Sequence, residues 1–489
     1  MSDVLIRGAH LLDAHRPFET GDILVRGGVI AEVAPSIAPP DGVQVIEAAG
    51  RIVMPGFVNA HTHSNQALEK GLCDRFPLDA WMVIASYGGA ASELRPRDLY
   101  VSAMVGAIEM IRSGTTAALD MARVDPRWFE EGTDAIMQAY ADVGLRAAVA
   151  VTITDLDFAS SLPLELVPGA ADDLKPGRVA SVDDIAAHLE TFVARWKGRH
   201  PLLQPMVGPS SLPRCSTELF GAALDIARNH GVGMQTHLLS AKSQVFVGTQ
   251  RYGGSTVDFL GRMGALEDWV SFAHSIWLDD KEAETIAKSP AVVVHNPVSN
   301  LKLGAGRSPV PLMVKHGANI ALGSDGASSA DNQNMFETVK GAAIVHRIAH
   351  DQSEWITAPQ ALSMCWEGGA KAMRTATGRI APGMQADLTI LNRRSLFLAP
   401  KEQMEGQLVH SELGASVDSV LVAGRVVLED GRITLVDEAA IHAEAQEIVE
   451  RLHSTLPARM EKFEKMRPLM QTLERTVNRT ALHFSRYCC

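Results

Sequence analysis

Hydrophobic residues recur with two different periods along this chain, and the change of period divides it into regions. Near both ends, short apolar runs are separated by glycine and proline: residues 4–7, 22–25, 29–33, 43–46, 387–391, 417–422 and 425–427. Such runs are typical of antiparallel strands joined by turns. We therefore predict that residues 1–54 and 383–436 build one small β-sandwich domain, with the middle of the chain inserted between them.

In the middle of the chain, strand-like runs alternate with helical patterns. Eight strand candidates follow one another: residues 52–63, 115–120, 146–152, 203–208, 232–238, 269–274, 291–296 and 319–324. This alternation predicts an α/β fold, a TIM (β/α)8 barrel over residues 55–382. An open doubly wound sheet would also alternate, but the count of eight and the polar residues at strand ends favour the barrel. Residues 437–489 are predicted as a C-terminal helical extension, a surface or dimer helix.

Composition narrows the function classes. The chain has 489 residues, a hydrophobic content of 46% and a formal net charge of -12. The acidic balance argues against nucleic-acid binding, which requires clustered basic residues. No apolar run is long enough for a membrane span, and the first residues lack the features of a signal peptide. Five scattered cysteines indicate a reduced protein without a disulfide framework, so we expect a cytoplasmic location.

Histidines and one aspartate gather at the predicted strand ends. His61 and His63 end the first barrel strand, His237 the fifth, His274 the sixth, and Asp325 follows the eighth. Residues i and i+2 of a strand point to the same face, and a TIM barrel carries its active site at the carboxyl ends of its strands. A single pair of histidines is weak evidence. Five such residues at four strand ends predict one site that can hold a divalent metal.

The motifs around these residues resemble the amidohydrolase superfamily, in its cytosine/guanine deaminase and triazine hydrolase (chlorohydrolase) branch. The resemblance covers nearly the whole chain. It is carried by five segments: PGFVNAHTH at 55–63, SGTT at 113–116, HNPVSNLKLG at 295–304, GSDG at 323–326 and GMQADL at 383–388. In that family a split β-sandwich flanks the barrel, which agrees with the terminal strands.

The resemblance implies a mononuclear metal held by His61, His63, His237 and Asp325. This ligand set suits Zn²⁺, with Fe²⁺ as the alternative. A metal-bound hydroxide would attack an electron-poor carbon of a small N-heterocyclic or related substrate and displace ammonia, an amine or another leaving group. Asp325 would accept a proton, and His274 would polarise the substrate or stabilise negative charge. The family also suggests a homodimer or larger homo-oligomer.

One position departs from the family pattern. Aromatic deaminases of this branch carry His-x-x-Glu after strand 5, where the glutamate protonates a ring nitrogen, but here the motif ends in Ser240. A serine hydroxyl cannot shuttle protons as a carboxylic acid does. Three explanations remain open: a substrate that needs no ring protonation, which we favour, a catalytically weak chain, or a substitute acid from Glu69, Asp74, Asp79, Asp155 or Asp157.

Substrate contacts are expected beside the metal. Gln66 is a candidate hydrogen-bond partner, Trp81 a candidate apolar wall and Ser240 a candidate polar contact, although Trp81 equally suits packing of its helix on the barrel. No arginine cluster signals a phosphate, so a small, mostly neutral organic substrate is expected. Two alternatives stay open: hydrolysis of an acyclic amide, urea or carbamate-like bond, and a non-catalytic metal-binding relative.

Overall fold

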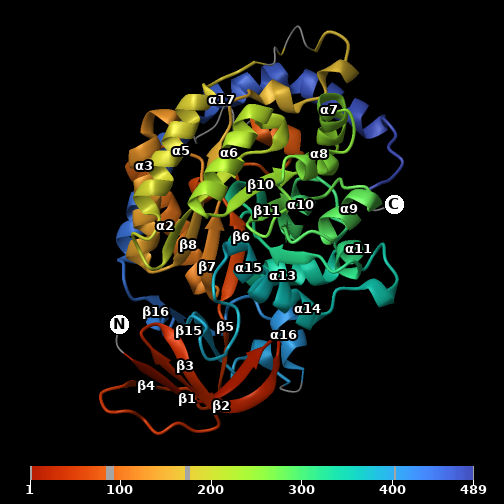
Figure 1. Ribbon diagram of the computed structural model, residues 1–489. Helices are drawn as coiled ribbons and strands as arrows, with labels where there is room; N and C mark the ends of the chain where they lie inside the picture. Colours follow the sequence, from red (N-terminus) through yellow and green to blue (C-terminus); the bar gives the residue numbers. More distant parts are fainter. Residues whose placement is uncertain (1–2, 84–92, 171–173, 175–176, 401–402, 488–489) are drawn as a thin grey trace.

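The computed structural model describes residues 3–83, 93–170, 174, 177–400 and 403–487. Cys488 and Cys489 lie outside the described residues. The chain forms two sheets, with helices packed around one of them (Figure 1). No helix in the described ranges is long and apolar enough to cross a bilayer.

The larger region is the predicted barrel, and the (β/α)8 fold is confirmed. Its eight parallel strands lie in sequence order: β6 (Phe57–Thr62), β7 (Thr115–Asp120), β8 (Arg146–Ile153), β9 (Leu203–Pro209), β10 (Met234–Leu238), β11 (Val270–His274), β12 (Val292–His295) and β13 (Asn319–Leu322). After β13, the backbone N–H of Asp325 donates to the carbonyl of His61 at 2.9 Å. A Cβ at Gly323 would lie 2.7 Å from the Cβ of His61, so only glycine allows this approach. The first and last strands therefore meet.

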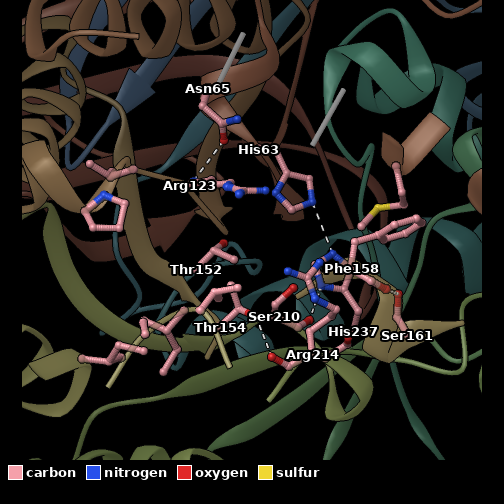
Figure 2. Close-up of a pocket in the computed structure, with 18 of the residues that line it drawn as sticks. His63, Asn65, Arg123, Thr152, Thr154, Phe158, Ser161, Ser210, Arg214 and His237 are labelled. Carbon is pink, nitrogen blue, oxygen red and sulfur yellow. Dashed lines mark hydrogen bonds between the residues drawn. The ribbon is translucent and has the colours of Figure 1, made fainter. Parts of the chain in front are cut away.

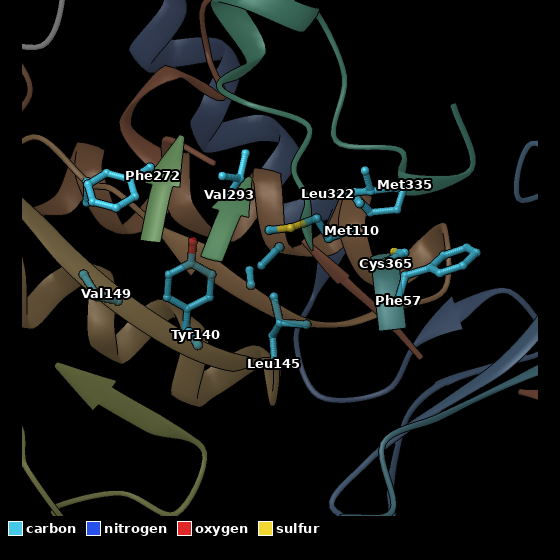
Figure 3. Packing of buried hydrophobic residues seen from close by; sticks show 14 of the residues in the cluster. Phe57, Met110, Tyr140, Leu145, Val149, Phe272, Val293, Leu322, Met335 and Cys365 are labelled. Carbon is cyan, nitrogen blue, oxygen red and sulfur yellow. The ribbon is translucent and has the colours of Figure 1, made fainter. Parts of the chain in front are cut away.

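Helices and short turns connect the strands and cover the barrel (Figure 1). Their bounds are α1 (Leu78–Trp81), α2 (Pro96–Arg112), α3 (Phe129–Val143), α5 (Val182–Trp196), α6 (Thr217–His230), α7 (Lys242–Tyr252), α8 (Thr256–Arg262), α9 (Asp280–Ala287), α10 (Pro297–Lys302), α11 (Val310–Lys315), α12 (Ala327–Ala330), α13 (Met335–Ile344), α14 (Ala358–Ser363), η9 (Met364–Gly368), α15 (Gly369–Met373) and α16 (Met404–His410). Apolar side chains of strands and helices fill the layer between them; Tyr140 of α3, Val149 of β8 and Phe272 of β11 are among those labelled in Figure 3. Their complete burial fixes each strand's orientation.

The terminal strands form a second, mixed sheet. They are β1 (Val4–Asp13), β2 (Arg16–Arg26), β3 (Val29–Ala34), β4 (Gln44–Glu47), β5 (Arg51–Pro55), β14 (Leu388–Asn392), β15 (Val417–Val422), β16 (Arg425–Glu429) and β17 (Arg432–Ile433). Its order is β17-β16-β15-β14-β5-β1-β2-β3, with β4 beside β1. The expected sandwich strands are thus hydrogen-bonded into one continuous sheet. The join is β5 with β14, which pairs Pro55 with Leu388.

The predicted strand 52–63 is in fact two strands that belong to different sheets. β5 ends at Pro55 in the terminal sheet, and β6 begins at Phe57 in the barrel. The intervening Gly56 passes so close to Thr116 that an added Cβ would lie 2.1 Å from its Cγ2. The apolar pattern runs through both strands, so periodicity alone could not show the break.

A buried ion pair ties the two sheets together. Arg146, which opens β8, donates from Nε to Asp387 Oδ2 at 2.6 Å and from Nη2 to Oδ1 at 3.0 Å. The same carboxylate accepts the backbone N–H of Ala423 at 2.8 Å. Asp387 is 2% exposed, so its charge depends on these partners.

The C-terminal extension is one long helix, α17 (Glu438–Arg479), as the charged helical pattern predicted. It packs against α2 and continues to α1 and α7, across the end of the barrel opposite the terminal sheet (Figure 1). Lys242 at the start of α7 donates to the carbonyls of Asn478 and Thr480 at the end of the helix. This lysine therefore anchors α17.

Candidate metal centre

The five residues singled out at the strand ends come together in the structure. His61 lies in β6 and His63 just beyond it, His237 lies in β10, and His274 ends β11. Asp325 follows β13. His274 and Asp325 have φ values of 69° and 68°, in the left-handed region that costs a non-glycine residue energy. Strain of this kind gathers at functional sites.

Their side-chain atoms are close enough to surround one ion. Asp325 Oδ1 lies 3.6 Å from His61 Nε2 and 3.3 Å from His63 Nε2. His237 Nε2 lies 3.3 Å from His63 Nε2. The ligand atoms of His61, His63 and Asp325 all lie within 4.8 Å of one another, as do those of His61, His237 and His274.

Each imidazole is oriented through its Nδ1 atom. His63 Nδ1 lies 2.7 Å from the carbonyl of Met121, and His237 Nδ1 lies 2.6 Å from that of Ser210. A carbonyl oxygen only accepts, so both Nδ1 atoms carry the proton and both Nε2 lone pairs face the centre. This is the usual arrangement of histidines that bind metals.

The other two imidazoles are held by side-chain amides. Gln235 Oε1 lies 2.7 Å from His61 Nδ1. The Nε2 of the same glutamine donates to the carbonyl of Ala60 at 3.0 Å, which fixes its oxygen as the acceptor. Asn300 Oδ1 lies 2.8 Å from His274 Nδ1 and therefore orients His274.

Burial sets the protonation of the centre. Burial and the neighbouring imidazoles of His63 and His237 hold the pKa of His61 well below its usual value. Burial, with His63 and His274, lowers the pKa of His237 to about 3. Burial disfavours the charge of Asp325, but the imidazole of His63 and the other nearby imidazoles outweigh burial and bring its pKa well below the usual value.

The donor set fits a divalent metal. His61 Nε2 is fully buried and has no hydrogen-bond partner among the described residues, which is costly unless another group binds its lone pair. Three imidazoles and a carboxylate, from the ends of three strands, are the ligand types that Zn²⁺ and related ions take. The side chains His61, His63, His237 and Asp325 are therefore suited to hold one ion.

A cavity of about 660 Å³ opens beside the centre. His63, His237, His274 and Asp325 form its floor, and Gln66, Trp81 and Ser240 all line it. The side chain of Gln66 accepts from Ser328 Oγ at 2.7 Å, and the indole of Trp81 donates to the carbonyl of Ser328 at 3.3 Å. Both residues are thus held rigidly at the cavity wall. Their roles toward a substrate stay predictions.

The structure adds residues that the sequence did not single out. Arg123 and Arg214 line the same cavity, on either side of Thr152 and Thr154 (Figure 2). They lie far apart in the sequence, so no basic cluster marks them. Gln235 was also missed, although it precedes His237 by two positions in β10 and therefore shares its inward face.

Comparisons with known proteins agree with this geometry. The Amidohydrolase family profile matches residues 52–427. A 5'-deoxyadenosine deaminase of Methanosarcina mazei is 31% identical over 92% of this chain and 99% of its own length. The crystal structure of an adenosine deaminase from Xanthomonas campestris with bound zinc aligns with a TM-score of 0.80 at 25% identity, over 93% of this chain and 99% of that one. A zinc complex of atrazine chlorohydrolase from Arthrobacter aurescens aligns at 0.81 and 23% identity, over 91% and 100%.

A (β/α)8 barrel with imidazoles and a carboxylate converging at its strand ends defines a metal-dependent hydrolase of small molecules. The chain belongs to the amidohydrolase family, whose profile covers most of its length. The family predicted from the strand-end motifs is confirmed.

Proposed function

We propose that this protein is a zinc-dependent hydrolase that displaces ammonia or a substituted amine from an electron-poor carbon of a nitrogen heterocycle. The observation that carries the proposal is the convergence of His61, His63, His237 and Asp325 around one point, with the Nδ1 of each imidazole already hydrogen-bonded. The deaminase activities named for the relatives support the choice of a C–N bond.

The side chains divide the chemistry between them. A bound divalent ion would lower the pKa of a coordinated water so that a nucleophile is available near neutral pH. Asp325 directs Oδ1 toward His61 and His63, while its Oδ2 lies 3.8 Å from His274 Nε2. One carboxylate oxygen can therefore serve as a ligand while the other accepts a proton from the attacking water. His274, oriented by Asn300, stands where negative charge would develop.

The cavity supports a substrate of about nucleoside size. Its volume lies within the range of ordinary ligand sites. Among the lining residues, Trp81, Phe129 and Phe158 supply apolar surface for a planar ring, and Arg123 and Asn65 supply polar groups. This mixture suits an aromatic heterocycle with a polar substituent.

Metal analysis joined to a substrate screen tests the proposal. We expect purified protein to hold one zinc per chain and to release ammonia from at least one nucleoside or related heterocycle. The His237→Ala variant should lose both metal and turnover. Stoichiometric metal with no turnover of any aromatic amine, amide, urea or carbamate would instead support a non-catalytic relative. Turnover of only the acyclic compounds would support the amide hydrolase alternative.

A second candidate reaction displaces a leaving group other than an amine, such as a halide. The observation that favours it is Ser240, which replaces the carboxylic acid expected after strand 5. Ser240 instead exchanges hydrogen bonds with Gln244, at 3.0 Å and 3.1 Å. Release of chloride from chlorinated heterocycles, without release of ammonia from their amino counterparts, would establish this candidate over the first.

We also propose a homo-oligomer in a reducing compartment, the cytoplasm. Support for the compartment comes from Cys73, Cys215 and Cys365, which are buried thiols outside any disulfide. Support for the oligomer comes only from the family resemblance. Light scattering of the purified protein measures the mass of the assembly, and a mass equal to one chain would exclude it.

A further inference from the structure

The carboxylates considered as substitutes for the missing acid occupy different environments. They are Glu69, Asp74, Asp79, Asp155 and Asp157. The side chain of Asp74 is 85% exposed. Asp157 accepts the backbone N–H of Ser160 in its own turn, and Asp155 accepts that of Ser216 at the start of α6. Glu69 is buried, but it does not line the cavity. Of these five described carboxylates, only Asp79 lines the cavity beside the metal centre.

Asp79 lines the same cavity as Ser240, the position of the missing acid. It belongs to α1, two residues before Trp81, and its Oδ1 accepts from the hydroxyl of Ser243 at 3.3 Å. Ser243 follows Ser240 by three positions, and Ser240 is bonded to Gln244. Asp79, Ser240 and Gln244 all line the cavity. The carboxylate therefore approaches the strand-5 loop from the opposing helix.

The surroundings of Asp79 suit a proton donor. Burial raises the pKa of Asp79 to about 6, the hydrogen bond from Ser243 opposes this, and the charge of Glu474 adds to it. Glu474 belongs to α17, and Tyr487 from the C-terminal tail also interacts electrostatically with Asp79. Both neighbours are acids, so neither stabilises the aspartate anion.

We propose that Asp79 is the proton donor of this enzyme and replaces the glutamate that Ser240 lacks. The proposal rests on the proposed function. As the water oxygen bonds to the electron-poor carbon, Asp325 takes one water proton and Asp79 gives its proton to the adjacent ring nitrogen. The C–N bond then breaks, the leaving amine takes the proton from Asp325, and the remaining hydroxyl proton returns through solvent to Asp79. The products are a ring carbonyl with a protonated ring nitrogen and ammonia.

Replacement of Asp79 by asparagine tests this role. On a substrate that the wild type deaminates, Asp79→Asn should lower kcat/KM by about 10²- to 10⁴-fold, the usual contribution of a general acid. The reaction needs the protonated acid, so wild-type kcat/KM should fall as the pH rises above about 6, and the variant should lack that limb. The matched control is Asp74→Asn, which changes an exposed carboxylate in the turns before α1 and should keep the wild-type profile.

A second variant separates catalysis from folding. Adding Ser240→Glu to Asp79→Asn should restore at least about tenfold of the lost rate, because a carboxylic acid then returns to the same wall. Asp79→Glu should retain part of the activity even if Asp79→Asn fails to fold. Metal content and melting temperature report intact protein. A folded, metal-loaded Asp79→Asn enzyme with the wild-type rate and pH profile overturns the role of Asp79 and leaves the proposed function standing. A wild-type protein that deaminates nothing overturns both.

Discussion

Removing the acceptor behind His61 should weaken metal binding without touching a ligand. Gln235 Oε1 accepts the Nδ1–H of His61 at 2.7 Å, and both side chains are 0% exposed. In Gln235→Leu this N–H would be buried without a partner, which costs about 1–3 kcal/mol. The ring would also lose its fixed orientation. Loss of such a partner typically lowers metal affinity by about 10- to 100-fold, or roughly 1.4–2.7 kcal/mol.

Competition with a chromophoric chelator measures this loss directly. The matched control is Thr236→Val, the next residue of β10, because its side chain is equally buried but points to the opposite face of the strand. We expect unchanged zinc affinity in Thr236→Val and the stated decrease in Gln235→Leu. Wild-type affinity in a folded Gln235→Leu protein would refute the argument that Gln235 orients a ligand.

Three further results are expected. His237→Ala should leave less than one zinc per chain by elemental analysis, and full occupancy would contradict its assignment as a ligand. Burial raises the pKa of Glu69 to about 7 from 4.5, so the protein should lose up to roughly 3 kcal/mol of stability as the pH rises from 4.5 to 7. Chemical denaturation at several pH values should show a flatter pH dependence for Glu69→Gln than for the wild type. An unchanged slope would contradict the raised pKa. Asp387→Ala should destabilise the fold by about 3–5 kcal/mol because it leaves the buried Arg146 unpaired, and a loss below about 1 kcal/mol in urea unfolding would count against that.

The fold could be predicted because alternation and strand count are local features. The eight barrel strands appear where the apolar runs lie, and strand-end histidines identify the metal site because parallel strands must end together. The break at Gly56 escaped prediction because buried apolar residues run up to it from both sides, from Ile52 in β5 and from Phe57 in β6. The close approach of Gly56 to Thr116 is visible only in the folded chain.

The side chains around the ligands were harder to foresee. The sequence offers several carboxylates near the site, and the pattern treats Glu69, Asp74 and Asp79 alike. The folded chain separates them: Asp74 is exposed, Glu69 is buried away from the cavity, and Asp79 lines the cavity where α1 packs on α17. Arg123 and Arg214 illustrate the same limit, since the turns after different strands bring them to one cavity.

The pairing of β5 with β14 has a consequence for biosynthesis. While the ribosome is still making the barrel, the edge of β5 that will hydrogen-bond to β14 has no partner strand. β1, β2 and β3 can already associate as neighbours, so the nascent chain carries a half-finished sheet with one open flank. Aggregation during expression is then expected to begin at that flank, and translation past β14 to end the exposure.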